Sequence, residues 1–167
     1  RLLPVEPGIR TLLMGFPDVI AASVTVSEVI ASGHVPAALE MMDQRMTIAV
    51  ENWLRAGLPV DAGAVLLAEV TGEEEGVVSQ ADVIASIARA NGATSIEIAE
   101  DPEHRALLWK GRKSAFGAIA QLAPDYYLHD AVVPRTRLVE TMKAVYEIGD
   151  RHGLTMLNVF HAGDGNL

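Results

Sequence analysis

Residues 9–41 read IRTLLMGFPDVIAASVTVSEVIASGHVPAALEM, and they predict a strand, a helix and a second strand in direct succession. The apolar run Ile9–Phe16 is typical of a strand and is closed by a proline. Asp18 can cap the next helix, whose apolar residues recur at helical spacing until Gly33. The second strand is expected at residues 37–41. A doubly wound parallel sheet would also fit this periodicity, but it lacks its fingerprint because no glycine-rich phosphate loop follows the first strand.

The rest of the chain continues the alternation of strands and helices. The further elements that the periodicity predicts are helices at 46–54, 73–90, 102–123 and 136–152, and strands at 64–70, 94–99, 130–133 and 155–161. This order predicts an α+β fold, a ferredoxin-like antiparallel sheet with helices packed on one face. Since no linker marks a second domain, we expect residues 1–167 to form a single domain.

The composition excludes several classes of protein. Over 167 residues, 50% hydrophobic content is enough for a sizeable core. The chain has no cysteine, so any metal would have to be held by histidine, carboxylates or neutral oxygens. The formal net charge of -9 opposes binding to nucleic acid. No apolar stretch approaches the roughly 20 residues that cross a bilayer, and the first residues lack a signal-peptide layout. We therefore expect a cytoplasmic protein.

The last residues, 155–167, read TMLNVFHAGDGNL and carry the densest group of chemically active side chains. Their period-2 alternation predicts a strand that ends at His161. The loop beyond it contains Gly163, Asp164, Gly165 and Asn166. Its glycines allow backbone N–H groups to approach a ligand, while its polar side chains supply oxygens and an amide. From the residues alone, His161 could be a metal ligand, an acid/base group or a structural residue, and the loop could be a plain surface turn.

Arg112 is the second informative residue. At about 100° per residue it falls in the same apolar sector of its predicted helix as Leu108 and Ala115. A guanidinium on a buried face needs anionic or hydrogen-bonding partners, and its planar fork suits a carboxylate. The alternatives are a structural ion pair with one of the 22 acidic residues or an arginine that reaches the surface.

Three ordered segments carry a family resemblance. They are Trp109–Arg112 (WKGR), Tyr127–Pro134 (YLHDAVVP) and His161–Leu167 (HAGDGNL). They resemble the W-x-x-R, Y-x-x-D-x-x-x-P and H-x-G-D-G-N-x-H motifs of the C-terminal domain of FAD-linked oxidases, the family of glycolate oxidase catalytic subunits and D-lactate dehydrogenases. The second histidine of the last motif would fall at position 168. Both ends of the chain therefore suggest a fragment of a longer polypeptide.

The resemblance implies roles for individual residues. Arg112 would bind the substrate carboxylate, and His129, inside the second motif, would face the site and contact the substrate. His161 would help to hold a divalent ion such as Zn or Mn that polarises the substrate hydroxyl. The loop 163–166 would contact the cofactor, FAD, which a preceding N-terminal domain would bind for the most part. With one histidine of the pair absent, we expect the fragment alone to bind metal weakly or not at all. Without the FAD domain, we expect it to be inactive.

The function that follows is oxidation of a small 2-hydroxy acid, of the glycolate or D-lactate type, to the 2-oxo acid. The expected partners are that substrate, the protein's own FAD domain, and other oxidase subunits with iron–sulfur clusters, through which the enzyme could associate peripherally with a membrane. Two other classes stay open. One is a noncatalytic ligand-binding or regulatory ferredoxin-like domain whose loop binds an anion, and the other is a structural interaction domain.

Overall fold

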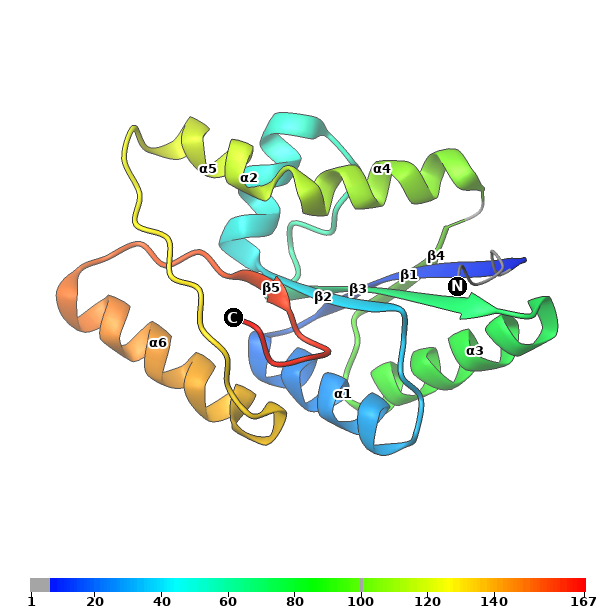
Figure 1. Ribbon diagram of the computed structural model, residues 1–167. Helices are drawn as coiled ribbons and strands as arrows, with labels where there is room; N and C mark the ends of the chain where they lie inside the picture. Colours follow the sequence, from blue (N-terminus) through cyan, green and yellow to red (C-terminus); the bar gives the residue numbers. More distant parts are fainter. Residues whose placement is uncertain (1–6, 100) are drawn as a thin grey trace, which may run out of the picture.

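The computed structural model describes residues 7–99 and 101–167, and its centre is a five-stranded antiparallel sheet (Figure 1). The strand order is β4-β1-β3-β2-β5, and each neighbouring pair is antiparallel. The strands are β1 (Gly8–Phe16), β2 (Ala38–Asp43), β3 (Ala64–Gly72), β4 (Ser95–Ile98) and β5 (Val159–His161). The predicted antiparallel sheet is therefore confirmed.

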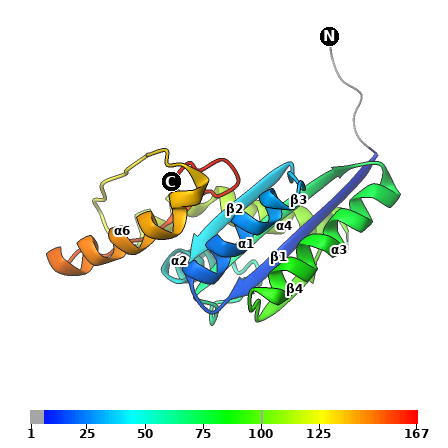
Figure 2. The ribbon, with the colours of Figure 1, turned by 90° about the horizontal axis from the view of Figure 1, so that it is seen from below.

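Helices cover both faces of this sheet. They are α1 (Val19–Ala31), α2 (Gln44–Leu54), α3 (Glu74–Ala90), α4 (Pro102–Lys113), α5 (Ala115–Leu122) and α6 (Leu138–His152), with a short 3-10 turn η1 (Arg135–Arg137) before α6. In Figure 1, α2, α4 and α5 lie above the sheet, whereas α1, α3 and α6 lie below it. The view from below in Figure 2 shows α1 and α3 along the sheet, with α6 farther out beyond α1. The expectation that the helices pack on one face is wrong.

The strands themselves explain the second layer of helices. Leu12 and Met14 belong to the core under α1 and α3, whereas Leu13 between them belongs to the core under α2, α4 and α5. Alternate side chains of a strand point to opposite faces, so an unbroken apolar run makes both faces apolar. β3 repeats this arrangement, with Leu66 on one face and Leu67 on the other. Each face therefore needs its own cover of helices.

The long helix expected at 102–123 is two helices. The chain bends at Ser114, where the backbone torsions (φ -91°, ψ 5°) leave helical values. After the bend, α5 lies directly against α2, because a Cβ on Gly117 would stand 2.3 Å from the ring of Trp53. The apolar periodicity continues across Ser114, so the sequence pattern does not reveal the break.

Two strands expected near the C-terminus are shorter in the structure than the sequence predicts. Residues 130–133 form one isolated bridge, Val132 to Asn166, because this segment pairs with the terminal loop and not with the sheet. The strand expected at 155–161 is limited to β5, which pairs with Glu40–Met42 of β2. The segment before it is tied to β2 by a single backbone bond, from Asp43 N to Asn158 O (3.0 Å).

Aspartates begin three of the helices. Asp18 accepts a hydrogen bond from Ala21 N, as its position in the sequence predicts, and Asp43 and Asp101 cap α2 and α4 in the same way. The acidic run before α3 places Glu74 and Glu75 in its first turn, where the helix dipole favours negative charge. None of the described helices is long and apolar enough to cross a membrane.

Candidate active site

Glu40, Arg112 and His161 meet on the face of the sheet that α4 covers. Glu40 is only 4% exposed. Its Oε2 accepts a hydrogen bond from Arg112 Nε (2.9 Å) and lies 2.8 Å from Arg112 Nη2, while its Oε1 lies 2.6 Å from His161 Nδ1. These three residues, from β2, α4 and β5, form what we call the Glu40 cluster.

The sheet register brings the acid and the imidazole together. Glu40 stands directly opposite His161 in the antiparallel ladder between β2 and β5, so both side chains lie on the same face. The helix that supplies Arg112 begins at Asp101, whose side chain accepts from His104 N (2.7 Å), with Pro102 in the first turn.

The contact with Glu40 fixes which nitrogen of His161 is available. An ionised carboxylate only accepts hydrogen bonds, so Nδ1 donates to it and Nε2 is the ring nitrogen that stays available. The imidazole side chain is 57% exposed although its partner is buried. His161 therefore presents an oriented basic nitrogen to the outside, an arrangement that suits proton transfer or ligand binding.

Arg112 lies on the inner, sheet-facing side of α4, as its helical position predicts. Its side chain is 13% exposed. The pair with Glu40 is the structural ion pair that the sequence left open as an alternative. Two of the three guanidinium nitrogens face Glu40, and no residue in the described part of the chain accepts a hydrogen bond from Nη1. The same arginine can therefore balance the charge of Glu40 and offer Nη1 to an anion.

The loop after β5 is tied to its own chain. The bonds that hold it are Gly163 N to Leu39 O (3.2 Å), Asn166 N to Asp164 Oδ1 (3.0 Å), Asn166 Nδ2 to Asp130 Oδ1 (2.8 Å) and Val133 N to Gly165 O (2.9 Å). Gly165 has φ +84°, and a Cβ there would lie 2.2 Å from Val133 O, so this position requires glycine. Two of the loop N–H groups are thus used within the chain. The cofactor contact of residues 163–166 stays a prediction.

His129 lies away from the Glu40 cluster. It is exposed, in the coil between α5 and η1, and its ring centre lies 4.7 Å from that of Tyr127, with the two ring planes tilted by 52°. No hydrogen bond or ion pair among the described residues joins it to Glu40, Arg112 or His161. Its substrate contact stays a prediction.

The described residues do not supply a metal site. Over residues 7–99 and 101–167, no group of three or more His, Cys, Asp or Glu side chains could hold an ion. His161 is joined by one carboxylate, that of Glu40, which already binds Arg112. The donor set therefore does not fit the divalent ion that the resemblance implies, and no step below depends on one.

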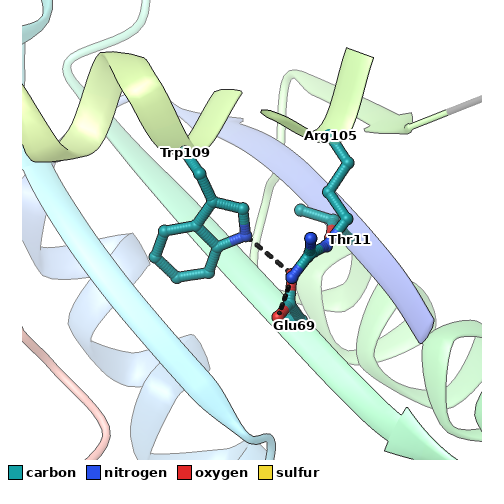
Figure 3. Close-up of polar contacts among 4 residues, drawn as sticks. All are labelled: Thr11, Glu69, Arg105 and Trp109. Carbon is teal, nitrogen blue, oxygen red and sulfur yellow. Dashed lines mark hydrogen bonds and ion pairs between the residues drawn. The ribbon is translucent and has the colours of Figure 1, made fainter. Parts of the chain in front are cut away.

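A second polar group lies on the same face of the sheet, under the first part of α4 (Figure 3). Arg105 donates from Nε to Glu69 Oε2 (2.8 Å) and from Nη2 to Glu69 Oε1 (2.7 Å). Trp109 Nε1 (2.6 Å) and Thr11 Oγ1 (2.8 Å) also donate to Oε2. We call these four residues the Glu69 cluster. Burial by itself would raise the pKa of Glu69, but these hydrogen bonds and the charge of Arg105 together lower it.

This lowered pKa predicts a pH dependence of stability. A carboxyl whose pKa is lower in the folded state stabilises the fold above its ordinary pKa of 4.5, and this contribution is lost as the pH falls through the folded value. The free energy of unfolding should therefore differ most between wild type and Glu69→Gln at about pH 7, and the difference should shrink towards about pH 4 and below. Urea unfolding of both chains across this range measures it. A difference that grows on acidification would contradict the pKa assignment.

The buried acid Asp43 is the reason why the unfolding experiment compares wild type with Glu69→Gln. Burial raises the pKa of Asp43, although hydrogen bonds from Met46 N, Asn158 and Tyr146 oppose the rise. A raised carboxyl pKa gives the opposite pH dependence, so the wild-type profile mixes both effects. Structurally, Asp43 caps α2 through Met46 and binds Tyr146 of α6 (2.9 Å) and Asn158 before β5 (2.8 Å). It therefore ties the segment that leads to His161 to the end of β2.

The sequence patterns considered above do not identify the three buried acids on which these contacts depend, Glu40, Asp43 and Glu69. A signal was present for two of them. Glu40 and Glu69 each interrupt an apolar strand run, and a charge inside such a run requires a partner when it is buried. The local sequence does not identify the partners of these two acids, because Arg112 and Arg105 lie 72 and 36 residues farther along the chain.

Comparisons with known proteins agree on one group. The family described as "FAD linked oxidases, C-terminal domain" matches residues 6–167. Glycolate oxidase subunit GlcD is 40% identical in Escherichia coli K12 and 36% identical in Bacillus subtilis, in each case over the whole chain. A D-lactate dehydrogenase from Archaeoglobus fulgidus is 27% identical, again over the whole chain. The chain spans 34%, 36% and 36% of the length of these three relatives.

Solved structures share the fold. An alkyldihydroxyacetonephosphate synthase superposes with a TM-score of 0.69 at 13% identity, over 98% of this chain and 36% of that one. The 4-ethylphenol oxidase from Gulosibacter chungangensis gives a TM-score of 0.63 at 16% identity, over 99% and 39%. At these identities the likeness concerns the arrangement of the helices and strands.

Proposed function

The chain belongs to the family of FAD-linked oxidase C-terminal domains, and from this premise we propose that it is the substrate domain of an FAD-dependent enzyme that oxidises a small 2-hydroxy acid. The relatives support this substrate class, because the two at 40% and 36% identity are named for glycolate and the one at 27% is named for D-lactate. The observation that carries the proposal is the Glu40 cluster, which combines an oriented imidazole with a buried guanidinium. Such a pair suits a molecule with a hydroxyl beside a carboxylate.

The cofactor of this reaction would be FAD. When bound, it supplies the acceptor for the hydride that leaves C2 of the substrate. The chain is about a third as long as its relatives, so we assign most of the FAD contacts to the remainder of the parent polypeptide. Within this chain, residues 163–166 fit such a role through the exposed side chain of Asp164, because part of the loop backbone is already used.

His161 would take the proton of the substrate hydroxyl at Nε2. The hydrogen bond from Nδ1 to Glu40 orients the ring and stabilises the imidazolium that forms. Arg112 balances the negative charge of Glu40, so Glu40 and Arg112 form a compensated ion pair beside the imidazole. The proton leaves from the hydroxyl oxygen while the hydride leaves from C2, which yields the 2-oxo acid.

Arg112 would hold the substrate carboxylate through Nη1. Replacing Arg112 with lysine should raise KM by about 10- to 100-fold, because a charge-assisted hydrogen bond contributes about 1.5–3 kcal/mol and an ammonium cannot face Glu40 and the substrate together. The value of kcat should change little if the grip is equal in ground and transition states. Steady-state kinetics of the flavin-loaded parent enzyme measure this. Arg137→Lys, on an exposed arginine paired with Glu140, is the matched control.

A substrate panel tests the function itself. The purified parent polypeptide with measured flavin content should bleach its flavin absorbance on anaerobic mixing with glycolate or D-lactate. The corresponding acids without the hydroxyl, acetate and propionate, should leave the flavin oxidised. If the enzyme is fully loaded with flavin and none of the 2-hydroxy acids reduces it, the proposed function is wrong. A noncatalytic ligand-binding domain would then be the better explanation.

We also propose how the domain is built and assembled. The order β4-β1-β3-β2, with α1 and α3 on one face, supports a ferredoxin-like unit to which α2, α4, α5, α6 and β5 are added. The relatives from Escherichia coli and Bacillus subtilis are named as subunits, which supports assembly with other oxidase subunits. A cytoplasmic location stays a proposal. Partners that carry iron–sulfur clusters would take the electrons onward.

A further inference from the structure

Two acid–arginine pairs attach α4 to the sheet, one near each end of the helix. Arg105 binds Glu69 and Arg112 binds Glu40. The two arginines are seven residues apart, which is close to two helical turns, so they lie on one face of α4. Trp109 lies on the same face between them and also donates to Glu69.

Apolar packing attaches α4 through Leu108, which belongs to the core on this face, and through the ring of Trp109, which packs against that core. Only Leu108 and Gly111 of its residues are buried. Gly111 contributes no side chain, and a Cβ there would just touch Val50, Ala56 and Leu58 at 3.7 Å. The polar contacts add to this packing, and because they are directional they restrain both the axial position and the rotation of the helix on the sheet.

The Glu69 cluster fixes both the axial position and the rotation of α4. The planar fork of Arg105 binds both carboxylate oxygens, so its direction is set as well as its distance. The indole of Trp109, one turn later, adds a second direction (Figure 3). Glu69 is itself held by the sheet, since β3 lies between β1 and β2 and Thr11 donates to it from the directly opposite position of β1.

The sheet sets the spacing between the two acids. Glu69 stands opposite Ala38 in the β2–β3 ladder, so Glu40 is two residues farther along β2 and on the same face. Arg105 and Arg112, seven residues apart on α4, each reach one of these two acids. A shift of the helix by one residue would rotate it by about 100° and break both pairs.

We propose that Glu69 is a positioning residue for the substrate carboxylate. It acts through Arg105, Trp109 and the body of α4, and it holds the guanidinium of Arg112 where Nη1 can receive the substrate. This inference rests on the proposed function of Arg112. No residue of the Glu69 cluster touches the substrate. The cluster would still influence KM, through the position of Arg112.

Glu69→Gln in the flavin-loaded parent enzyme is the first test. Glutamine is isosteric and keeps an oxygen for Thr11 and Trp109, but it turns an N–H₂ group towards Arg105, so the fork is lost. We expect KM for the 2-hydroxy acid to rise about ten-fold while kcat stays within about three-fold, because the lost interaction is uniform binding. A merely structural defect would lower the amount of active enzyme, and therefore the apparent kcat, without this change in KM.

A double variant shows whether the effect passes through Arg112. In the Arg112→Lys background, adding Glu69→Gln should change KM by less than about two-fold, since coupled residues are not additive. Glu140→Gln, which removes the acid of the exposed Arg137 pair, should leave KM at the wild-type value. If Glu69→Gln does not give folded enzyme, Arg105→Lys replaces it as the test. This variant keeps the positive charge but loses the planar fork, and the same rise in KM is expected.

Each outcome decides the inference. A raised KM in the single variant, with no further rise in the double variant, supports it. The inference is overturned if KM is unchanged in Glu69→Gln, or if the two substitutions raise KM independently so that their fold-changes multiply. The proposed function stays intact in both cases. A wild-type enzyme that oxidises no 2-hydroxy acid removes the proposed function, and this inference falls with it.

Discussion

Replacing His161 with alanine in the flavin-loaded parent enzyme should lower kcat by at least about 100-fold, the usual contribution of a positioned general base. The reason is the geometry of the ring. Glu40 holds Nδ1 at 2.6 Å, and the side chain is more than half exposed, so Nε2 is the atom available to the substrate hydroxyl. Alanine removes an interaction that grows towards the transition state, so KM should change much less than kcat.

The measurement is steady-state kinetics with glycolate and D-lactate, with flavin content determined for every preparation. His152→Ala is the matched control, because His152 is exposed in the last turn of α6. It should keep the wild-type kcat. If His161→Ala retains near-wild-type kcat and KM, His161 is a surface histidine that merely covers Glu40, and the base must be sought elsewhere.

The first half of the fold could be predicted from the sequence because local signals coincide there. Pro17 and Asp18 mark the boundary between β1 and α1, and the structure confirms the strand to Phe16 and the cap at Asp18. Glycines mark further ends: Gly33, Gly72 and Gly92 have positive φ. Each of these signals acts over a few residues, so it can be read without knowing the fold.

The side of the sheet on which a helix packs could not be predicted in this way. Periodicity identifies the apolar face of α2, but it does not say which face of the sheet receives it. A further clue was available in the run Leu12-Leu13-Met14, because consecutive buried residues require both faces to be covered. The expected single layer of helices overlooked this requirement.

The candidate site was only partly accessible for the same reason. Arg112 could be placed on an inner face from helical spacing, and His161 at a strand end from alternation. Their common partner Glu40 depends on the pairing of β2 with β5, two strands about 120 residues apart. Long-range pairing of this kind is set by the assembled sheet, and no local pattern around Glu40 specifies it.

Glu40→Ala should give the largest loss of stability among single substitutions at the site. It leaves the guanidinium of Arg112, 13% exposed, without its anion, and removing one member of a buried ion pair costs about 3–5 kcal/mol. Urea unfolding of the 167-residue chain, followed by circular dichroism, should show a lower midpoint with an unchanged slope. Glu140→Ala, which breaks the exposed pair with Arg137, should leave the midpoint close to the wild-type value, because water screens exposed ion pairs.

A double replacement separates the two functions of this pair. Charges taken out of water gain little over a well-packed apolar pair, so Glu40→Leu combined with Arg112→Leu should recover most of the stability that Glu40→Ala loses. If the pair served the fold alone, the parent enzyme with this double replacement would stay active. We expect the reverse, a folded protein that has lost both the anchor for the substrate carboxylate and the acid that orients His161. Recovered stability with wild-type turnover would sink the catalytic assignment of the whole Glu40 cluster, because no other contact in the described part of the chain orients that imidazole.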